Sequence, residues 1–187
     1  VDMSTTLGNA WFPTPIFTAS GCASSGKELS QFFALKDVGA IVTKSVMAKP
    51  RHGRPTPRMA ETPSGMLNSI GLQGPGIDAF LAHDLPWLIE QKARVIVSIA
   101  GETIEEYATL ARKLRSAAGI SAVEVNISCP NVENRGLVFA CDPDASRRVI
   151  DGVRKTIGGE LPIIAKLSPD VTNLAEIAKG VVDAGAD

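Results

Sequence analysis

The chain has 187 residues, of which 44% are hydrophobic and 21% charged, and its formal net charge is −1. This balance is typical of a folded domain, and it provides no overall field that would draw the protein to nucleic acid or to an acidic membrane. No apolar run approaches the ~20 residues of a membrane helix, and the N-terminus lacks the basic and apolar regions of a secretory signal. Three cysteines without a CxxC spacing argue against a disulfide framework and a metal site, and they indicate a reducing cytoplasm.

Short β-branched runs alternate along the chain with longer segments of helical pattern. The runs span residues 15–20, 40–47, 94–101, 122–128 and 162–168. Each run is almost continuously apolar, which is typical of strands in a parallel sheet whose two faces are both covered. We therefore expect five parallel strands, each followed by a helix.

Helix signals lie between these runs. Capping-box spacing occurs at Ser25 with Glu28, at Thr103 with Glu106 and at Asn173 with Glu176, and Asp142–Pro143 has the pattern of an N-cap followed by the first helical residue. Glycines 158 and 159 indicate a helix end. Apolar stripes at helical spacing within residues 104–114 and 174–182 predict helices that pack on the sheet.

Two α/β folds suit this order of elements. Five strand–helix units joined by right-handed crossovers could form a five-stranded doubly wound sheet, or about five of the eight units of a (β/α)8 TIM barrel. A whole barrel typically needs ~250 residues, and this chain ends at "VVDAGAD", a pattern that leads into another strand. We favour a single barrel domain over residues 1–187, truncated before strand 6.

One connection, residues 49–76, is unusually long for a compact domain. It contains five prolines and no helical period, and it follows the second predicted strand, so we expect it at the carboxyl edge of the sheet. Loops of this length are usually functional. Its cluster of basic residues, Lys49, Arg51, Arg54 and Arg58, lacks interleaved aromatic residues and is interpreted as a solvated loop in preference to a nucleic-acid patch.

Polar side chains stand where the predicted strands end. They are Ser20, Lys44 with Ser45, Ser98, Asn126 with Cys129, and Lys166. A lysine inside an apolar run either extends to water or needs an anionic partner. Because Lys44 and Lys166 occupy separate strands at similar depth, the pair favours a shared anionic ligand.

Cys129 differs from Cys22 and Cys141, which we expect to be buried and inert. It ends a strand, and a thiol there acts as a nucleophile or, when ionised, as a base. Neither of the two histidines lies near a strand end, which argues against a Cys–His protease pair. Three amides, Asn68, Asn126 and Asn131, offer the donors and acceptors that suit the edge of a pyrimidine-like ring.

Taken in order, six motifs resemble those of the dihydroorotate dehydrogenase family. They are "TASG" (18–21), "GAIVTKS" (39–45), "RPTPRMAETPSGMLNSIGLQGPG" (54–76), "SIAG" (98–101), "VNISCPNV" (125–132) and "AKLSPDVTN" (165–173). The resemblance implies an FMN-containing (β/α)8 barrel that oxidises dihydroorotate to orotate in pyrimidine biosynthesis. In having a cysteine in "NISCPN", the chain resembles the soluble class 1 enzymes. The sequence "ETPSGMLNSIGLQ" resembles that of the class 1B catalytic subunit, which pairs with an iron–sulfur and FAD subunit and passes electrons to NAD.

The resemblance also assigns roles residue by residue. Cys129 takes the position of the general base. The flavin positions fall on Ser20, Lys44, Ser45, Ser98, Asn126 and Lys166, with Ser98 standing where the family pattern leads us to expect asparagine. The substrate positions fall on Lys44, Asn68, Ser69, Ile70, Gly71, Leu72, Asn126 and Asn131. The residues from Cys129 to about Cys141 match a mobile lid. A homodimer is implied, and neither nucleic acid nor membrane is an expected partner.

Three competing interpretations of the sequence remain open. A related barrel, that of dihydropyrimidine dehydrogenase, shares the strand-end cysteine and acts on uracil or thymine. The same residues would also suit a non-catalytic flavin-binding module or an interaction protein that uses the basic loop.

Because barrels frequently bind phosphate through loops after strands 7 and 8, we expect residues 1–187 alone neither to hold FMN tightly nor to turn over.

Overall fold

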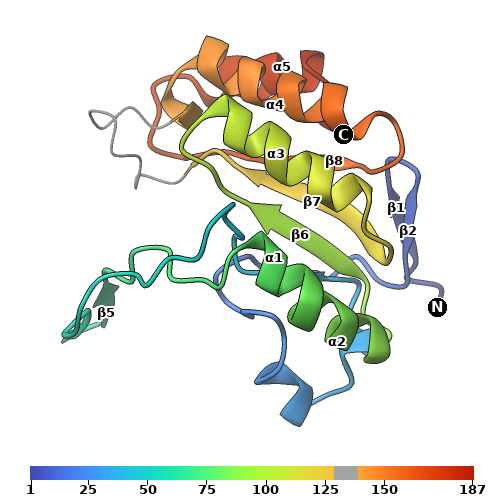
Figure 1. The fold of residues 1–187 in the computed structure, drawn as a ribbon, viewed down its shortest axis with the longest axis vertical. Coiled ribbons are helices and arrows are strands. Elements are labelled where there is room, and N and C mark those ends of the chain that lie inside the picture. The colour runs from blue at the N-terminus through green and yellow to red at the C-terminus, as the bar shows by residue number, and fades with distance from the viewer. Residues whose placement is uncertain (129–138) are drawn as a thin grey trace.

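A four-stranded parallel sheet organises the structure, a computed structural model that describes residues 1–128 and 139–187 (Figure 1). Its strands are β3 (Ile41–Val42), β6 (Val95–Ile99), β7 (Ile120–Asn126) and β8 (Ile163–Lys166), paired in that order. The helices between and after them are α1 (Ile77–Ala79), the π-helical turn η3 (Phe80–Asp84), α2 (Leu85–Glu90), α3 (Ile104–Arg115), α4 (Pro143–Ile157) and α5 (Leu174–Asp183). Short 3-10 turns are η1 (Leu29–Gln31), η2 (Leu35–Asp37) and η4 (Phe139–Cys141).

The strand order separates the two candidate folds. Sheet neighbours follow one another in sequence, whereas a doubly wound sheet reverses its order at a switch point. The helices also pack on one face only, where residues of α2, α3 and α4 form a single core with Val97, Val123 and other outward-facing residues (Figure 1). The described residues therefore form an α/β structure with the strand order and one-sided helix layer of part of a barrel.

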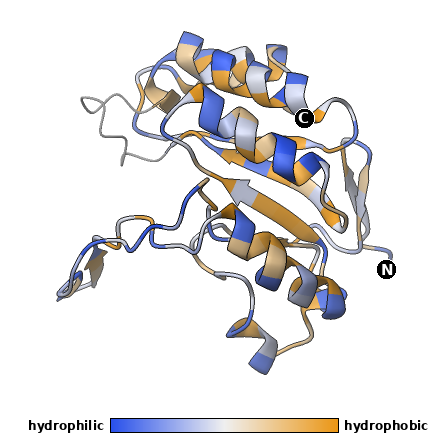
Figure 2. Cartoon of the chain, in the orientation of Figure 1, coloured by the Kyte–Doolittle hydropathy of each residue, from blue (hydrophilic) through white to orange (hydrophobic). Residues whose placement is uncertain are grey.

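Alternation along the strands sorts their side chains between two layers. Val95, Val97 and Ile99 face the helices, whereas Ile96 belongs to a separate inner cluster with Phe12. Figure 2 shows hydrophobic residues along these strands, and both hydrophobic and hydrophilic residues on the helices. Each fully buried aliphatic side chain contributes about 1.5–3 kcal/mol, so the two layers hold the sheet in a single register.

An N-terminal hairpin lies at the end where the strands begin. It consists of β1 (Thr5–Leu7) and β2 (Ala10–Phe12), and the fully buried Phe12 packs on the inner cluster. The hairpin therefore covers the inner layer at the end where the strands begin. The polar strand ends lie at the opposite, carboxyl edge of the sheet (Figure 1).

The first predicted strand, residues 15–20, is wrong in extent although its position is right. Phe17 forms a single parallel bridge with Ala40, and Thr18 N donates to Ala40 O at 3.1 Å. The Thr18 hydroxyl, not its backbone, accepts from Val42 N at 2.9 Å, and this side-chain bond replaces the next rung of the ladder. The segment therefore lies beside β3 without forming a regular strand.

Three of the four predicted helix starts are confirmed. The side chains of Thr103, Asp142 and Asn173 each accept a hydrogen bond from a backbone N–H in the first turn of α3, α4 and α5. The predicted start at Ser25 is wrong, because Gly26 has a φ of +84° that breaks a right-handed helix there. The segment instead forms turns that lead into η1.

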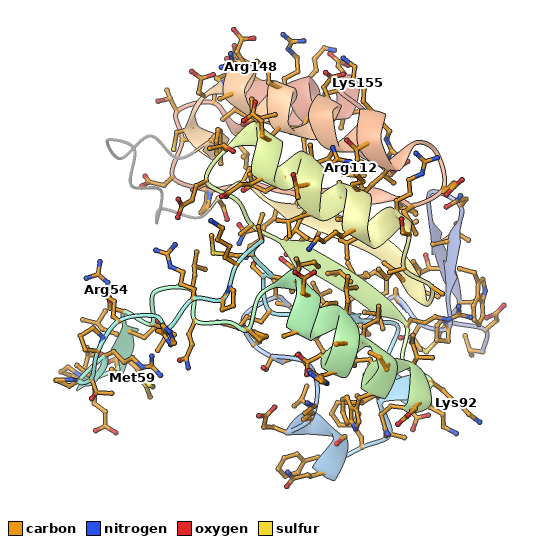
Figure 3. All side chains as sticks on the ribbon, in the orientation of Figure 1. Arg54, Met59, Lys92, Arg112, Arg148 and Lys155 are labelled. Carbon is orange, nitrogen blue, oxygen red and sulfur yellow. The ribbon has the colours of Figure 1, made fainter. Side chains whose placement is uncertain are left out.

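The long connection contains a hairpin that the sequence pattern did not reveal. Strands β4 (Met59–Thr62) and β5 (Gly65–Asn68) pair antiparallel, and all their residues are exposed. Reciprocal backbone bonds of 2.9 Å between Arg51 and Gly74 close the base of the connection. The hairpin projects beyond the carboxyl edge of the sheet, with Arg54 and Met59 pointing away from the core (Figure 3). In the part of the chain that the structure describes, no helix has the length and apolar character to cross a bilayer.

Candidate active site

Hydrogen bonds join side chains from separate strand ends at the carboxyl edge of the sheet. Ser45 Oγ lies 3.0 Å from Ser98 Oγ, and Asn126 Nδ2 donates to Ser45 Oγ at 2.9 Å. Beside them, Lys166 Nζ donates to Ser20 Oγ at 3.2 Å. The structure thus brings five of the predicted site residues into two hydrogen-bonded groups.

A bulge after β3 places Lys44 and Ser45 on the same side of the chain. Val42 pairs with Ile96 and Val46 pairs with Ile99, so four steps along this segment oppose three along β6. An extra residue of this kind interrupts the alternation of side chains. Val46 returns to the helix-facing core, while Lys44 and Ser45 both line a pocket of about 770 Å³.

The pocket lies between the bulge and two other segments of the chain. Its walls come from residues 21–28, from the bulge, and from the two ends of the long connection at residues 50–52 and 70–75, with Phe80 and Asp84 completing it. Lys44 is half-buried there, and its backbone N–H donates to Ser24 O at 2.9 Å. Its ammonium group has no hydrogen-bond or ion-pair partner among the described residues. An ammonium group in this position favours an anionic ligand.

The side chain of Asn126 is held in one orientation. It is 6% exposed, and its Oδ1 accepts from Ser128 N at 3.2 Å and from Ser128 Oγ at 2.8 Å. Because a backbone N–H only donates, it identifies the atom that faces it as the amide oxygen. The backbone oxygen of Asn126 accepts from the Tyr107 hydroxyl at 2.7 Å, which further anchors the strand end. Within the described residues, the second N–H of this amide has no hydrogen-bond acceptor.

The substrate positions expected at residues 68–72 lie apart from this cluster. Asn68 and Ser69 are exposed at the base of the hairpin, whereas Ile70 lines the pocket. The structure does not bring the Asn68 amide into contact with Asn126. Cys129 and Asn131, together with most of the lid expected from Cys129 to about Cys141, lie outside the described residues.

An arginine that the sequence pattern suggested to be solvated connects the segment around Gly71 to a neighbouring helix. Arg51 Nε donates to Gly71 O at 3.2 Å, and Arg51 Nη1 donates to Glu102 Oε1 at 2.9 Å. Glu102 follows β6, and its own backbone N–H donates to Glu106 Oε2 at 2.8 Å. Arg51 therefore connects the segment around Gly71 to the start of α3.

Other features of the site were missed or predicted wrongly. Ser128 could have been recognised, because a serine two residues after asparagine commonly bonds back to its side chain. Glu124 faces the inner layer, and its Oε1 is buried without a partner in the described part of the chain, a position where a further donor would be stabilising. Cys22 and Cys141 are exposed, not buried, because each lies in a turn outside the core.

Comparison with known proteins matches residues 2–187 to the family described as dihydroorotate dehydrogenase. Curated relatives named "Dihydroorotate dehydrogenase B (NAD(+)), catalytic subunit" include one from Geotalea uraniireducens, 47% identical over 186 residues, and one from Geobacter sp. strain M21, 46% identical over 186 residues. Both alignments cover 100% of this chain and 60% of the relative. A relative of the same name from Bacillus cytotoxicus is 44% identical over 173 residues, which is 92% of this chain and 55% of that protein. The chain thus spans little more than half the length of these relatives.

Proposed function

The chain belongs to the dihydroorotate dehydrogenase family, and from this premise we propose that its protein oxidises dihydroorotate to orotate in pyrimidine biosynthesis. The observation that carries the proposal is the linked group of Ser45, Ser98 and Asn126, whose donors meet at the carboxyl edge of the sheet. In barrels, this edge is where active sites are built. Family membership gives these donors a substrate class, which hydrogen-bond geometry alone does not.

We further propose that residues 1–187 form one domain that supplies about five of the eight units of a (β/α)8 barrel. The sequential strand order and the single layer of helices support this architecture. So does the segment around Phe17, which lies beside β3 as a first strand would. The greater length of the relatives, of which this chain covers 60%, agrees with a larger barrel.

The strand-end residues fit FMN by their chemistry. A flavin ring carries carbonyl and nitrogen acceptors and gains negative charge on reduction, and the site offers hydroxyl and amide donors beside the ammonium group of Lys166. The residues proposed to contact FMN are Ser20, Lys44, Ser45, Asn126 and Lys166, and Ser98 lies behind Ser45 in the same group. When bound, FMN would supply the acceptor for the hydride that leaves C6 of dihydroorotate. Lys166 would stabilise negative charge on the ring.

We propose Cys129 as the general base that removes the proton from C5. As the C6 hydrogen leaves with its electron pair, the thiolate takes the C5 proton and the C5=C6 double bond forms. A positioned base of this kind contributes about 10²–10⁴-fold to the rate. The residues proposed to bind substrate are Lys44, Asn68, Ser69, Ile70, Gly71, Leu72, Asn126 and Asn131. The ammonium group of Lys44, which lines the pocket, is assigned to the carboxylate.

The names of the relatives support a partner subunit and NAD as the final electron acceptor, because each is called an NAD(+) catalytic subunit. We propose that this partner carries FAD and an iron–sulfur cluster, and that the catalytic subunits form a homodimer. Location in the cytoplasm stays the prediction made from the cysteine pattern.

The test is an anaerobic reaction of the purified full-length protein with dihydroorotate. The reaction is monitored through the loss of the visible absorbance of oxidised flavin and through the formation of orotate. Dihydrouracil is the matched control substrate, because it lacks the carboxylate. We expect dihydroorotate, and not dihydrouracil, to reduce the flavin. In Cys129→Ser the rate of flavin reduction near neutral pH should decrease by about 10²–10⁴-fold, with FMN still bound.

Three outcomes would contradict these assignments. Faster reduction by dihydrouracil would favour an enzyme of the dihydropyrimidine dehydrogenase kind. Bound flavin that neither substrate reduces would indicate a non-catalytic flavin module. Unchanged dihydroorotate affinity in Lys44→Ala would remove Lys44 from the carboxylate site.

A further inference from the structure

Ser98 is completely buried on β6, at a position where the family resemblance predicts direct contact with flavin. Its side chain is 0% exposed and does not line the pocket. Within the described residues, the hydrogen-bonding partner of its hydroxyl is Ser45 Oγ, at 3.0 Å. Its backbone N–H donates to Thr43 Oγ1 at 3.2 Å, so the strand itself is anchored at this point.

The direction of the Ser98–Ser45 hydrogen bond follows from the lack of a second acceptor for Ser98 among the described residues. If Ser45 donated to Ser98, the Ser98 proton would be left buried without an acceptor, and such a group is destabilising. The Ser98 hydroxyl therefore donates to Ser45 Oγ. The Asn126 amide also donates to Ser45 Oγ, at 2.9 Å, and its orientation is fixed by Ser128.

Two donors then occupy both acceptor positions of the Ser45 oxygen. A hydroxyl has two lone pairs and one proton, so a serine that accepts twice keeps only its proton for another group. Ser45 lines the pocket, and its proton therefore points to whatever the pocket contains. In this arrangement Ser45 serves as a donor and is no longer free to act as an acceptor.

We propose that Ser98 is a positioning residue that, through Ser45, presents one hydroxyl donor to an acceptor atom of the bound ligand. The inference rests on the proposed function, in which the ligand ring is the flavin and the acceptor is one of its carbonyl oxygens or unprotonated ring nitrogens. A donor facing such an atom binds more strongly as the ring gains negative charge. Ser98 thus favours binding of the flavin, and its reduced form above all, without contacting it.

The test is a double-mutant cycle in the full-length protein, with Ser98→Ala, Ser45→Ala and both together. The FMN dissociation constant is measured by fluorescence titration, and the flavin midpoint potential by anaerobic reductive titration. We expect Ser45→Ala and Ser98→Ala each to raise the dissociation constant by roughly 3- to 10-fold and to lower the potential. Because Ser98 acts through Ser45, the double variant should match Ser45→Ala alone.

Control measurements keep the result interpretable. Ser98→Cys has nearly the same shape and a weaker donor, so its FMN affinity should fall between those of the wild type and Ser98→Ala. It also replaces Ser98→Ala if the latter does not fold, as judged by its urea unfolding midpoint. Additive effects in the cycle would show that Ser98 acts independently of Ser45 and would overturn the proposal. So would an unchanged FMN affinity and midpoint potential in folded Ser98→Ala. If the wild type bound no FMN, the proposed function would fail together with this inference, whereas the other results overturn the inference alone.

Discussion

Replacing Arg51 by alanine tests whether its side chain holds in place the segment around Gly71, which belongs to the proposed substrate positions 68–72. The side chain links Gly71 O, at 3.2 Å, to the carboxylate of Glu102, at 2.9 Å. Both charged side chains are about one-third exposed, at 32% and 34%, so solvent screens their attraction. In Arg51→Ala the backbone bonds between residue 51 and Gly74 still close the loop, but the residues around Gly71 lose their side-chain connection to α3.

The expected size of the effect follows from these two bonds. A partly exposed ion pair contributes about 0.2–1 kcal/mol, and a hydrogen bond from a charged donor to a carbonyl adds a similar amount after screening. A total of about 0.4–2 kcal/mol changes the population of the ordered segment by about 2- to 30-fold. Under the proposed function, substrate binds only the ordered segment, so the apparent KM for dihydroorotate should rise by up to this factor. The kcat should change little, because the chemical step occurs after the segment is ordered.

Steady-state kinetics of the full-length protein with dihydroorotate provide the measurement. Glu102→Gln keeps an acceptor but removes the charge, so it should raise KM by less than Arg51→Ala. In combination with Arg51→Ala it should add little, because both variants disrupt the same pair. Lys113→Ala is the matched control. Lys113 lies near the end of α3, toward the beginning of the strands, and its cation pairs with Asp78 of α1.

Two results would refute this reasoning. One is a KM for Arg51→Ala no higher than that of Lys113→Ala, which would mean that the segment is ordered without the tether. The other is a large decrease in kcat with KM unchanged, which would place Arg51 in the chemical step.

Two further predictions concern stability and are measured by urea unfolding. Leu110→Ala, in the fully buried face of α3, should lower the free energy of unfolding by about 2–5 kcal/mol, whereas the exposed Ile89→Ala should change it far less; equal effects would contradict the assigned core. Asp142→Ala should lower the free energy of unfolding by about 1 kcal/mol, because the carboxylate caps α4 through a 2.7 Å bond from Ala145 N. Asp142→Asn should retain most of that stability, and equal losses in both variants would argue against the cap.

Local sequence signals predicted the fold wherever local physics decides it. The alternation in residues 122–128 separates Val123 and Val125 from Glu124 and Asn126, and the structure places the two valines in the helix-facing core. The cap at Thr103 is equally local, since it involves atoms three residues apart. The start predicted at Ser25 fails for a local reason as well, because the glycine beside it adopts a left-handed conformation.

Tertiary contacts decided the features that the sequence patterns could not predict. The strand near residue 17 is reduced to a bridge because the Thr18 side chain, and not its backbone, bonds to Val42 across 24 residues. The hairpin of β4 and β5 was not predicted, because its strands are exposed and short and lack the apolar pattern by which buried strands are recognised. Arg51 looked like one of several solvated cations until its contact with Glu102, 51 residues away, was visible.

The sequence by itself determined which chemical groups stand at the ends of the strands, because a period of two and the strand boundaries are properties of neighbouring residues. It therefore predicted Ser20, Ser98 and Lys166 as site residues, and its motifs predicted the family that the comparisons confirm. Only the tertiary structure decided which of these groups touch. The Lys166–Ser20 bond joins residues 146 positions apart, and Ser45 reaches Ser98 because a bulge after β3 adds one residue against β6. Contacts of this kind depend on the register between strands, which packing of the whole sheet determines.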